Sequence, residues 1–200
     1  MERRLWLVRH GHRLDFAQPE WFNTAPRRYD PPLSIQGQSQ AQSLAQNLAL
    51  QPIDHLFCSP FLRAIQTAAP LGEGLGLQLK VEAGLGEWLN PDWMTATPQL
   101  EPWESLYHQY PQIDTRYQAR LIPTYPESLA AVLARVATIS QQLLADFPGN
   151  HLWVGHSITL QGALTALLGQ PPIGSFPFAT VVGLTQTPRG WLLESPILPQ

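Results

Sequence analysis

Short apolar runs recur along the chain, each bounded by polar residues or glycine. Residues 5–8, 53–58 and 151–154 form runs of this kind, which is typical of strands buried in a sheet. Two later runs, at residues 178–185 and 191–194, predict two further strands. Strands that alternate with helical segments predict a mainly parallel sheet that is covered on both faces.

Two segments between these runs carry apolar residues at helical spacing. Residues 34–50 predict a helix that is capped by Ser34, with a row of leucine and alanine side chains on one face. Residues 126–147 predict a second helix, which ends before a Pro-Gly pair. No internal repeat or linker interrupts the chain, so residues 1–200 are expected to form one domain with a three-layer α/β/α architecture.

Two segments do not fit this alternation of strands and helices. We call residues 14–32 the first lid segment and residues 88–125 the second lid segment. Both are rich in proline and aromatic residues and lack a sustained period. Long irregular loops in a compact domain are usually functional, so we expect these segments to form the walls of a pocket. Six aromatic side chains are candidates to line it, although packing within the lid segments is the alternative for each of them: Trp21, Phe22, Tyr29, Trp93, Trp103 and Tyr107.

Two of the predicted strands end in a histidine, and this is the strongest chemical signal in the chain. The first strand ends in Arg9-His10-Gly11 and the third ends in Gly155-His156-Ser157. Ligands of open α/β sheets bind beyond the carboxyl ends of the strands. One histidine in such a place is more often a turn or core residue, but two in matching contexts indicate a site that contains both.

A third segment combines a strand end with an arginine. The strand at residues 53–58 is followed by Ser59 and Pro60, which predict an N-cap and the first position of a helix. Arg63 then falls in the first turns, where free N–H groups already attract anions. The alternative is an arginine that faces solvent. If the site binds a phosphate, Arg63 is expected to be its second arginine ligand, beside Arg9.

These motifs together resemble the histidine phosphatase superfamily, which has a phosphoglycerate mutase-like fold. The resemblance covers nearly the whole chain and rests on Arg9-His10-Gly11, Pro32-Leu33-Ser34 with Gly37 and Gln40-Ala41, Ser59-Pro60 through Thr67-Ala68, and Gly155-His156-Ser157. Arg13, Asp15 and Gly84-Leu85-Gly86-Glu87-Trp88 are most similar to the suppressors of T-cell receptor signalling. The ubiquitin-associated and SH3 segments of that branch cannot be read in these residues.

The resemblance implies a phosphomonoester hydrolase that works through a covalent phosphohistidine on His10. Arg9, Arg63 and Arg13 are expected to hold the phosphate oxygens. His156 and the N–H groups that follow Ser157 are expected to complete the cradle. Glu87 is the candidate proton donor, and partial desolvation beside Trp88 is expected to favour its protonated form. The alternative for Glu87 is an ordinary loop glutamate.

Composition narrows the range of partners. The net charge is −3 and the pI is near 6.0, which favours neither nucleic acid nor an anionic membrane. Cys58 is the only cysteine, and the histidines lack metal-ligand spacing, so we expect a buried thiol, no metal and no cofactor. A chain without an apolar span or a signal peptide is expected in the cytoplasm.

Two alternative functions remain at this stage. A phosphoglycerate mutase-type phosphotransferase would conserve the phosphate, but the chain lacks the extra length by which the mutases retain their intermediate. A non-catalytic module that binds a phosphorylated ligand would need the arginines but no nucleophile or acid. The substrate is either a phosphorylated small molecule or a phosphoprotein, and the sequence does not indicate the oligomeric state.

Overall fold

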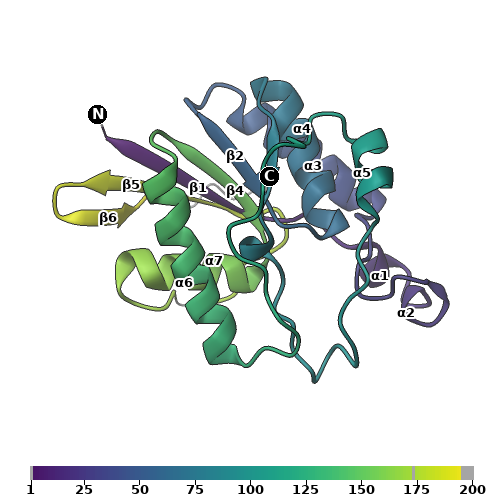
Figure 1. Cartoon of the computed structure of the whole chain (residues 1–200). Coiled ribbons are helices and arrows are strands. Elements are labelled where there is room, and N and C mark those ends of the chain that lie inside the picture. Colours follow the sequence, from purple (N-terminus) through teal and green to yellow (C-terminus); the bar gives the residue numbers. More distant parts are fainter. Residues whose placement is uncertain (1, 173, 195–200) are drawn as a thin grey trace.

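The computed structural model describes residues 2–172 and 174–194, and a sheet of six strands lies at its centre (Figure 1). The strand order is β3-β2-β4-β1-β5-β6. β1 pairs in parallel with β4, as β2 does with β4 and β3, whereas β5 runs antiparallel to β1 and β6. The strands are β1 (Arg3–Arg9), β2 (His55–Cys58), β3 (Leu79–Val81), β4 (His151–Gly155), β5 (Val181–Thr187) and β6 (Gly190–Leu193).

Helices cover both faces of this sheet (Figure 1). α3 and α4 pack on one face, and α6 and α7 pack on the other. The sequence prediction of a three-layer α/β/α fold with a mainly parallel sheet is therefore confirmed. The helices are α1 (Leu14–Ala17), α2 (Trp21–Thr24), α3 (Ile35–Leu48), α4 (Leu62–Leu75), α5 (Trp103–Gln109), α6 (Leu129–Asp146) and α7 (Ser157–Leu168), with a 3₁₀ turn η1 (Ala83–Leu85).

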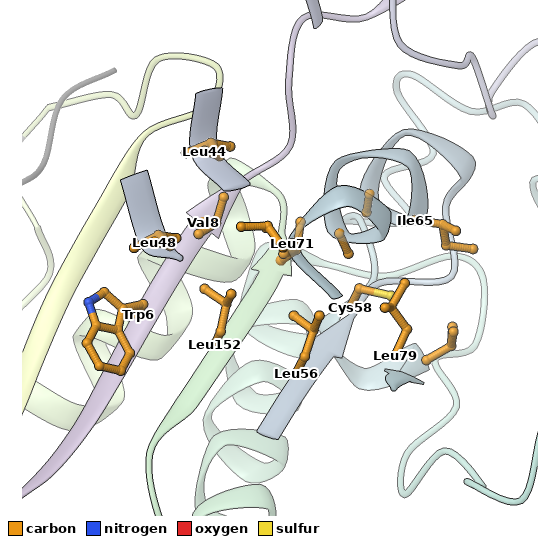
Figure 2. Packing of buried hydrophobic residues seen from close by; sticks show 14 of the residues in the cluster. Trp6, Val8, Leu44, Leu48, Leu56, Cys58, Ile65, Leu71, Leu79 and Leu152 are labelled. Atoms are coloured by element: carbon orange, nitrogen blue, oxygen red, sulfur yellow. The ribbon is translucent and has the colours of Figure 1, made fainter. Parts of the chain in front are cut away.

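The alternation of side chains along β1 explains why its run is apolar throughout. Trp6 and Val8 face α3 and α4, in the cluster of Figure 2, whereas Leu5 and Leu7 pack against α6 and α7. All four side chains are almost completely buried. Each such side chain stabilises the fold by about 1.5–3 kcal/mol through the removal of apolar surface from water. A strand covered on both faces has no polar side, which is why a continuous apolar run identified it.

The register of the parallel strands places three loops at one edge of the sheet. Arg9 is paired with Gly155 between β1 and β4, and Cys58 is paired with Val154 between β2 and β4. The residues that follow these strands, His10, His156 and Ser59, are consequently neighbours. Cys58 itself is fully buried, as predicted.

Local hydrogen bonds set the starts of the helices and correct two predictions. Ser34 caps α3 by accepting from the N–H of Gly37 at 3.1 Å, as expected. The second predicted helix begins at Leu129, after a cap by Ser128, and not at residue 126. Ser59 and Pro60 do not begin α4, which starts at Leu62 without a side-chain cap from its own N-cap residue.

The two lid segments contain little regular structure. The first holds only the short helices α1 and α2, and the second holds α5. Among the residues that the structure describes, no helix is long and apolar enough to cross a membrane.

Candidate active site

Two histidines lie side by side at the carboxyl ends of β1 and β4. The ring centroids of His10 and His156 are 5.1 Å apart, and both side chains are almost completely buried. The backbone N–H of His10 donates to the carbonyl of Gly155 at 2.9 Å, which joins the two loops directly. The structure thus brings the two strand ends together, as the prediction of a shared site requires.

The orientation of His10 leaves one ring nitrogen available for chemistry. Its Nδ1 lies 2.8 Å from the carbonyl oxygen of Gly11, and because a carbonyl only accepts, Nδ1 carries the proton. Nε2 therefore holds the lone pair. Burial lowers the pKa of His10 well below its usual value, and the positive charge of Arg63 lowers it further. His10 is thus a neutral imidazole with a free Nε2 at physiological pH.

His156 is held by contacts on both ring nitrogens. Nε2 lies 2.7 Å from the hydroxyl of Ser59, and Nδ1 lies 3.2 Å from a carboxylate oxygen of Glu87. Burial lowers the pKa of His156 to about 4, while the charge of Glu87 acts in the opposite direction. Ser59, expected as a helix cap, instead orients the second histidine.

Arg63 lies in the first turn of α4 and is buried between the lid and the two histidines. Its guanidinium is 3.2 Å from Glu87, 3.4 Å from Nδ1 of His156 and 3.9 Å from the carboxylate of Asp30. Burial lowers the pKa of Arg63 to about 10, so it remains a cation at neutral pH. The alternative of a solvent-facing arginine is wrong, because its side chain is 1% exposed.

Glu87 follows η1, and its carboxylate contacts both Arg63 and His156. Burial alone would raise the pKa of its carboxyl, but His156 and Arg63 outweigh burial and hold the pKa well below the usual value. The expectation that desolvation protonates Glu87 is therefore wrong for these contacts, since the acid is paired with an arginine. The sequence could show the proximity of Trp88 but not that of Arg63.

A cavity of about 470 Å³ opens beside these groups. Arg9 and Arg13 line it together with Glu87, and Ser157 contributes from the start of α7. The guanidinium of Arg9 lies over the ring of Phe178 at 4.1 Å, and Arg13 is paired with Asp15, with Nε 2.9 Å from Oδ1. All seven predicted site residues thus lie in this cluster or line its cavity.

The charge of the cluster favours an anion. Arg9 and Arg13 come from the end of β1 and the loop after it, and Arg63 comes from α4. The buried Nε atoms of Arg9 and Arg63 have no hydrogen-bond partner among the described residues. Ligand atoms of His10, Glu87 and His156 lie within 4.8 Å of one another, a spacing that suits a metal ion. However, Arg63 already provides a positive charge beside two of these three groups, which disfavours a second cation.

Most of the candidate aromatic side chains do not line this cavity. Among the six candidates, only Trp93 lines the cavity, next to Trp88, which was not among them. Phe22 packs edge to face on Tyr29 and Trp103 stacks on Tyr107 instead. These contacts are the packing within the lid segments that the sequence left open as the alternative.

Two residues of the site were missed. Asp30 is fully buried and accepts from the N–H of Leu62 at 2.8 Å, so the first lid segment caps α4 from outside. Phe178 packs against both His10 and Arg9. The only sequence signal for Asp30 was its place before two prolines, and no local pattern indicated Phe178.

Comparison with known proteins agrees with this geometry. Residues 5–195 match the histidine phosphatase superfamily (branch 1). The chain is 29% identical over 97% of its length to an ecdysteroid-phosphate phosphatase of Drosophila melanogaster, covering 32% of that protein. It is 26% identical over 90% of its length to the human ubiquitin-associated and SH3 domain-containing protein B, covering 34% of that protein. The chain thus spans about a third of these relatives.

Solved structures show the same fold. The ecdysone phosphate phosphatase of Bombix mori, in complex with tungstate, superposes with a TM-score of 0.81 at 23% identity, covering 99% of this chain and 94% of the other. A mycobacterial glucosyl-3-phosphoglycerate phosphatase in complex with VO3 has a TM-score of 0.69 at 26% identity, with 96% and 98% covered.

The fold and the matched residues define the class of protein, a histidine phosphatase-type domain. The chain belongs to the histidine phosphatase superfamily, branch 1.

Proposed function

We propose that this chain hydrolyses phosphate monoesters in two steps, through a phosphohistidine on Nε2 of His10. The observation that carries the proposal is the state of His10, which is neutral, has its proton on Nδ1 and lies near the buried cation of Arg63. A neutral imidazole nitrogen with a free lone pair is a competent nucleophile toward phosphorus. The surrounding guanidinium groups suit a transition state whose charge is spread over the phosphoryl oxygens.

In the first step, Arg9, Arg13 and Arg63 hold the phosphoryl group while Nε2 of His10 attacks phosphorus. The P–N bond forms as the P–O bond to the alcohol breaks, and the leaving oxygen takes a proton from Glu87. A phosphate that binds Arg63 and His156 takes over their contacts with Glu87, and its negative charge raises the pKa of the carboxyl. Glu87 can then take up a proton from solvent and deliver it to the leaving oxygen.

In the second step, water attacks the phosphohistidine and the P–N bond breaks. Glu87, now a carboxylate, accepts the proton of that water, and inorganic phosphate is released. His156 and the N–H groups at the start of α7, near Ser157, bind the same oxygens in both steps. No metal and no cofactor takes part in this scheme.

Hydrolysis of p-nitrophenyl phosphate in the presence of a chelator tests this function. We expect turnover in wild type, loss of at least about a thousandfold in His10→Ala, and an acid-labile phosphate that is trapped on wild type only. A folded protein without turnover and without trapped phosphate would refute the hydrolase. Phosphate transfer that requires a phosphorylated primer would support the mutase, and tight phosphate binding alone would support the binding module.

We further infer that the substrate is a phosphorylated small molecule with an apolar alcohol, and that the chain groups with the ecdysteroid-phosphate phosphatase and the ubiquitin-associated, SH3-containing proteins. Trp88, Trp93, Leu129 and Ile158 contribute apolar walls to the cavity beside the arginines. Its volume of about 470 Å³ lies in the range of sites for small organic ligands. A relative of this chain is named for a steroid phosphate, which agrees with such a wall.

The inference of an apolar substrate is tested by comparing kcat/KM for three kinds of phosphate ester. Phosphates of a steroid, a sugar and a tyrosine-containing peptide are compared under one set of conditions. A preference of at least about tenfold for the steroid phosphate is expected from the apolar contacts. Preference for the sugar phosphate would overturn the apolar substrate class, and preference for the peptide would indicate a phosphoprotein substrate.

A further inference from the structure

A buried ion pair lies behind the segment that carries Glu87. Arg135, in α6, and Glu127, just before α6, have side chains that are 4% and 6% exposed. The pair is bidentate, with Nε of Arg135 2.7 Å from Oε1 of Glu127 and a terminal nitrogen 2.8 Å from Oε2. Charges this deeply buried are costly unless every donor is satisfied, so their remaining contacts indicate what they do.

The remaining donors of Arg135 all bind the backbone of the Glu87 segment. One terminal nitrogen donates to the carbonyls of Gly84 at 2.9 Å and Gly86 at 3.1 Å. The other donates to the carbonyl of Glu87 itself at 3.1 Å. With the two bonds to Glu127, all five N–H groups of the guanidinium are used.

Glu127 holds the other side of the same segment. Its Oε2 accepts from the N–H of Leu89 at 3.1 Å, and its backbone N–H donates to the carbonyl of Leu89 at 2.9 Å. Its carbonyl accepts from the indole N–H of Trp88 at 2.9 Å. The backbone on both sides of Glu87 is thus bound to one ion pair.

The segment needs such support because regular structure does not provide it. η1 ends at Leu85, and Glu87 lies in an irregular stretch between that turn and the second lid segment. A proton donor must lie within hydrogen-bond reach of the leaving oxygen, and side chains on loops are held less exactly than those on strands. A planar guanidinium with five directed donors can hold the carbonyls of Gly84, Gly86 and Glu87 in one arrangement.

We propose that Arg135 and Glu127 are positioning residues that set the carboxyl of Glu87 for proton transfer to the leaving alcohol. This inference rests on the proposed function, in which Glu87 is the proton donor. Neither residue is among those that line the cavity. Their effect on the rate is therefore transmitted through the backbone of residues 84–89.

The test compares two substrates that differ in their need for a proton donor. p-Nitrophenyl phosphate has a leaving group that departs as an anion, whereas 2-phenylethyl phosphate needs a proton and has a similar apolar body. The variants are the pair change Arg135→Met with Glu127→Gln, which leaves no unpaired buried charge, and Arg135→Lys, which keeps the charge but offers at most three donors. Leu143→Ala, at a buried position of the same helix, is the control for lost stability.

We expect the pair change and Arg135→Lys to lower kcat/KM for 2-phenylethyl phosphate at least about tenfold more than for p-nitrophenyl phosphate. Glu87→Gln should show the same selective loss, and adding it to the pair change should not deepen that loss. Leu143→Ala should keep the wild-type ratio of the two constants. If the pair change does not fold, Arg135→Lys carries the test by itself.

Equal losses on both substrates in a folded Arg135 variant, alongside a selective loss in Glu87→Gln, would overturn the positioning role and leave the proposed function intact. Equal losses in Glu87→Gln would remove Glu87 as the proton donor and overturn this inference with it. Trapping of phosphate on His10 reports on the hydrolase separately in either case.

Discussion

At the scale of single residues, the chemistry of the site depends on which atom of each side chain is already bonded. The hydrogen bond to the Gly11 carbonyl fixes the proton of His10 on Nδ1, and the hydroxyl of Ser59 forms a hydrogen bond with Nε2 of His156. The two histidines therefore present different nitrogens to the site, although they follow strands of the same kind. Their proposed roles as nucleophile and phosphate ligand follow from this difference.

Trp93 offers a test of the apolar wall at this scale. Its side chain lines the cavity, is 59% exposed and packs on Trp88 with ring centroids 5.2 Å apart. We expect Trp93→Ala to lower kcat/KM for a steroid phosphate about fivefold, because an aromatic contact contributes about 1 kcal/mol. Constants for a sugar phosphate should change less than about twofold on the same reasoning.

Trp103→Ala is the matched control for Trp93→Ala. Trp103 is also an exposed lid tryptophan, but it stacks on Tyr107 and does not line the cavity. Trp103→Ala should leave kcat/KM unchanged for both the steroid phosphate and the sugar phosphate. Equal losses on the steroid and the sugar phosphate in Trp93→Ala would show that the tryptophan supports the site without selecting the substrate.

At the scale of elements, the loop after β1 is packed directly on the start of α3. A Cβ added at Gly37 would lie 2.2 Å from the carbonyl oxygen of His12, and one added at Gly11 would lie 2.7 Å from the carbonyl of Gly37. The N–H of Ser34 also donates to the His12 carbonyl at 2.9 Å. Only glycine lets the two backbones approach this closely.

A pair of glycine substitutions tests this contact. Gly37→Ala should lower the free energy of unfolding by about 1–3 kcal/mol, because the backbone oxygen of His12 cannot move aside without shifting the catalytic loop. Gly74→Ala, inside α4 with no atom within 4 Å, should raise it by about 0.5–1 kcal/mol through helix propensity. Urea unfolding followed by circular dichroism measures both. A Gly37→Ala variant as stable as wild type would contradict the close packing.

At the scale of the whole molecule, three buried histidines link stability to pH. Burial lowers the pKa of His151 to about 3 and that of His156 to about 4, and it also lowers the pKa of His10. An unfolded chain takes up these protons near the ordinary histidine pKa of about 6.5, before the folded chain does. Protonation therefore favours unfolding, and stability should fall as the pH drops below about 6.5.

His151 allows this linkage to be measured outside the active site. It is buried in β4 and bonded to the carbonyl of Phe147 at 2.7 Å. His151→Gln should make the loss of unfolding free energy between about pH 6.5 and 4 shallower, by up to about 1.4 kcal/mol per pH unit. His108→Gln, at an exposed position of α5, should keep the wild-type slope. An unchanged slope in His151→Gln would show that another group controls acid unfolding.

Most of the fold and the main site residues could be predicted because their signals are local. The apolar runs of β1, β2 and β4 identified strands that are buried on both faces, and the residues that end them identified Arg9, His10 and His156. Arg63 followed from its place after a strand. The lid aromatics could not be sorted, because an exposed tryptophan in a cavity wall and one stacked on a neighbour have the same local pattern.

The sequence by itself determined the layered α/β architecture and the set of charged groups at one edge of the sheet, because periodicity and strand ends depend on neighbouring residues. Only the tertiary structure decided that Asp30 caps α4, that Ser59 orients His156, and that contacts with His156 and Arg63 lower the pKa of Glu87. Each of these contacts joins residues at least 24 positions apart. Their distances and their effect on pKa values arise when the sheet brings separate loops to the same edge.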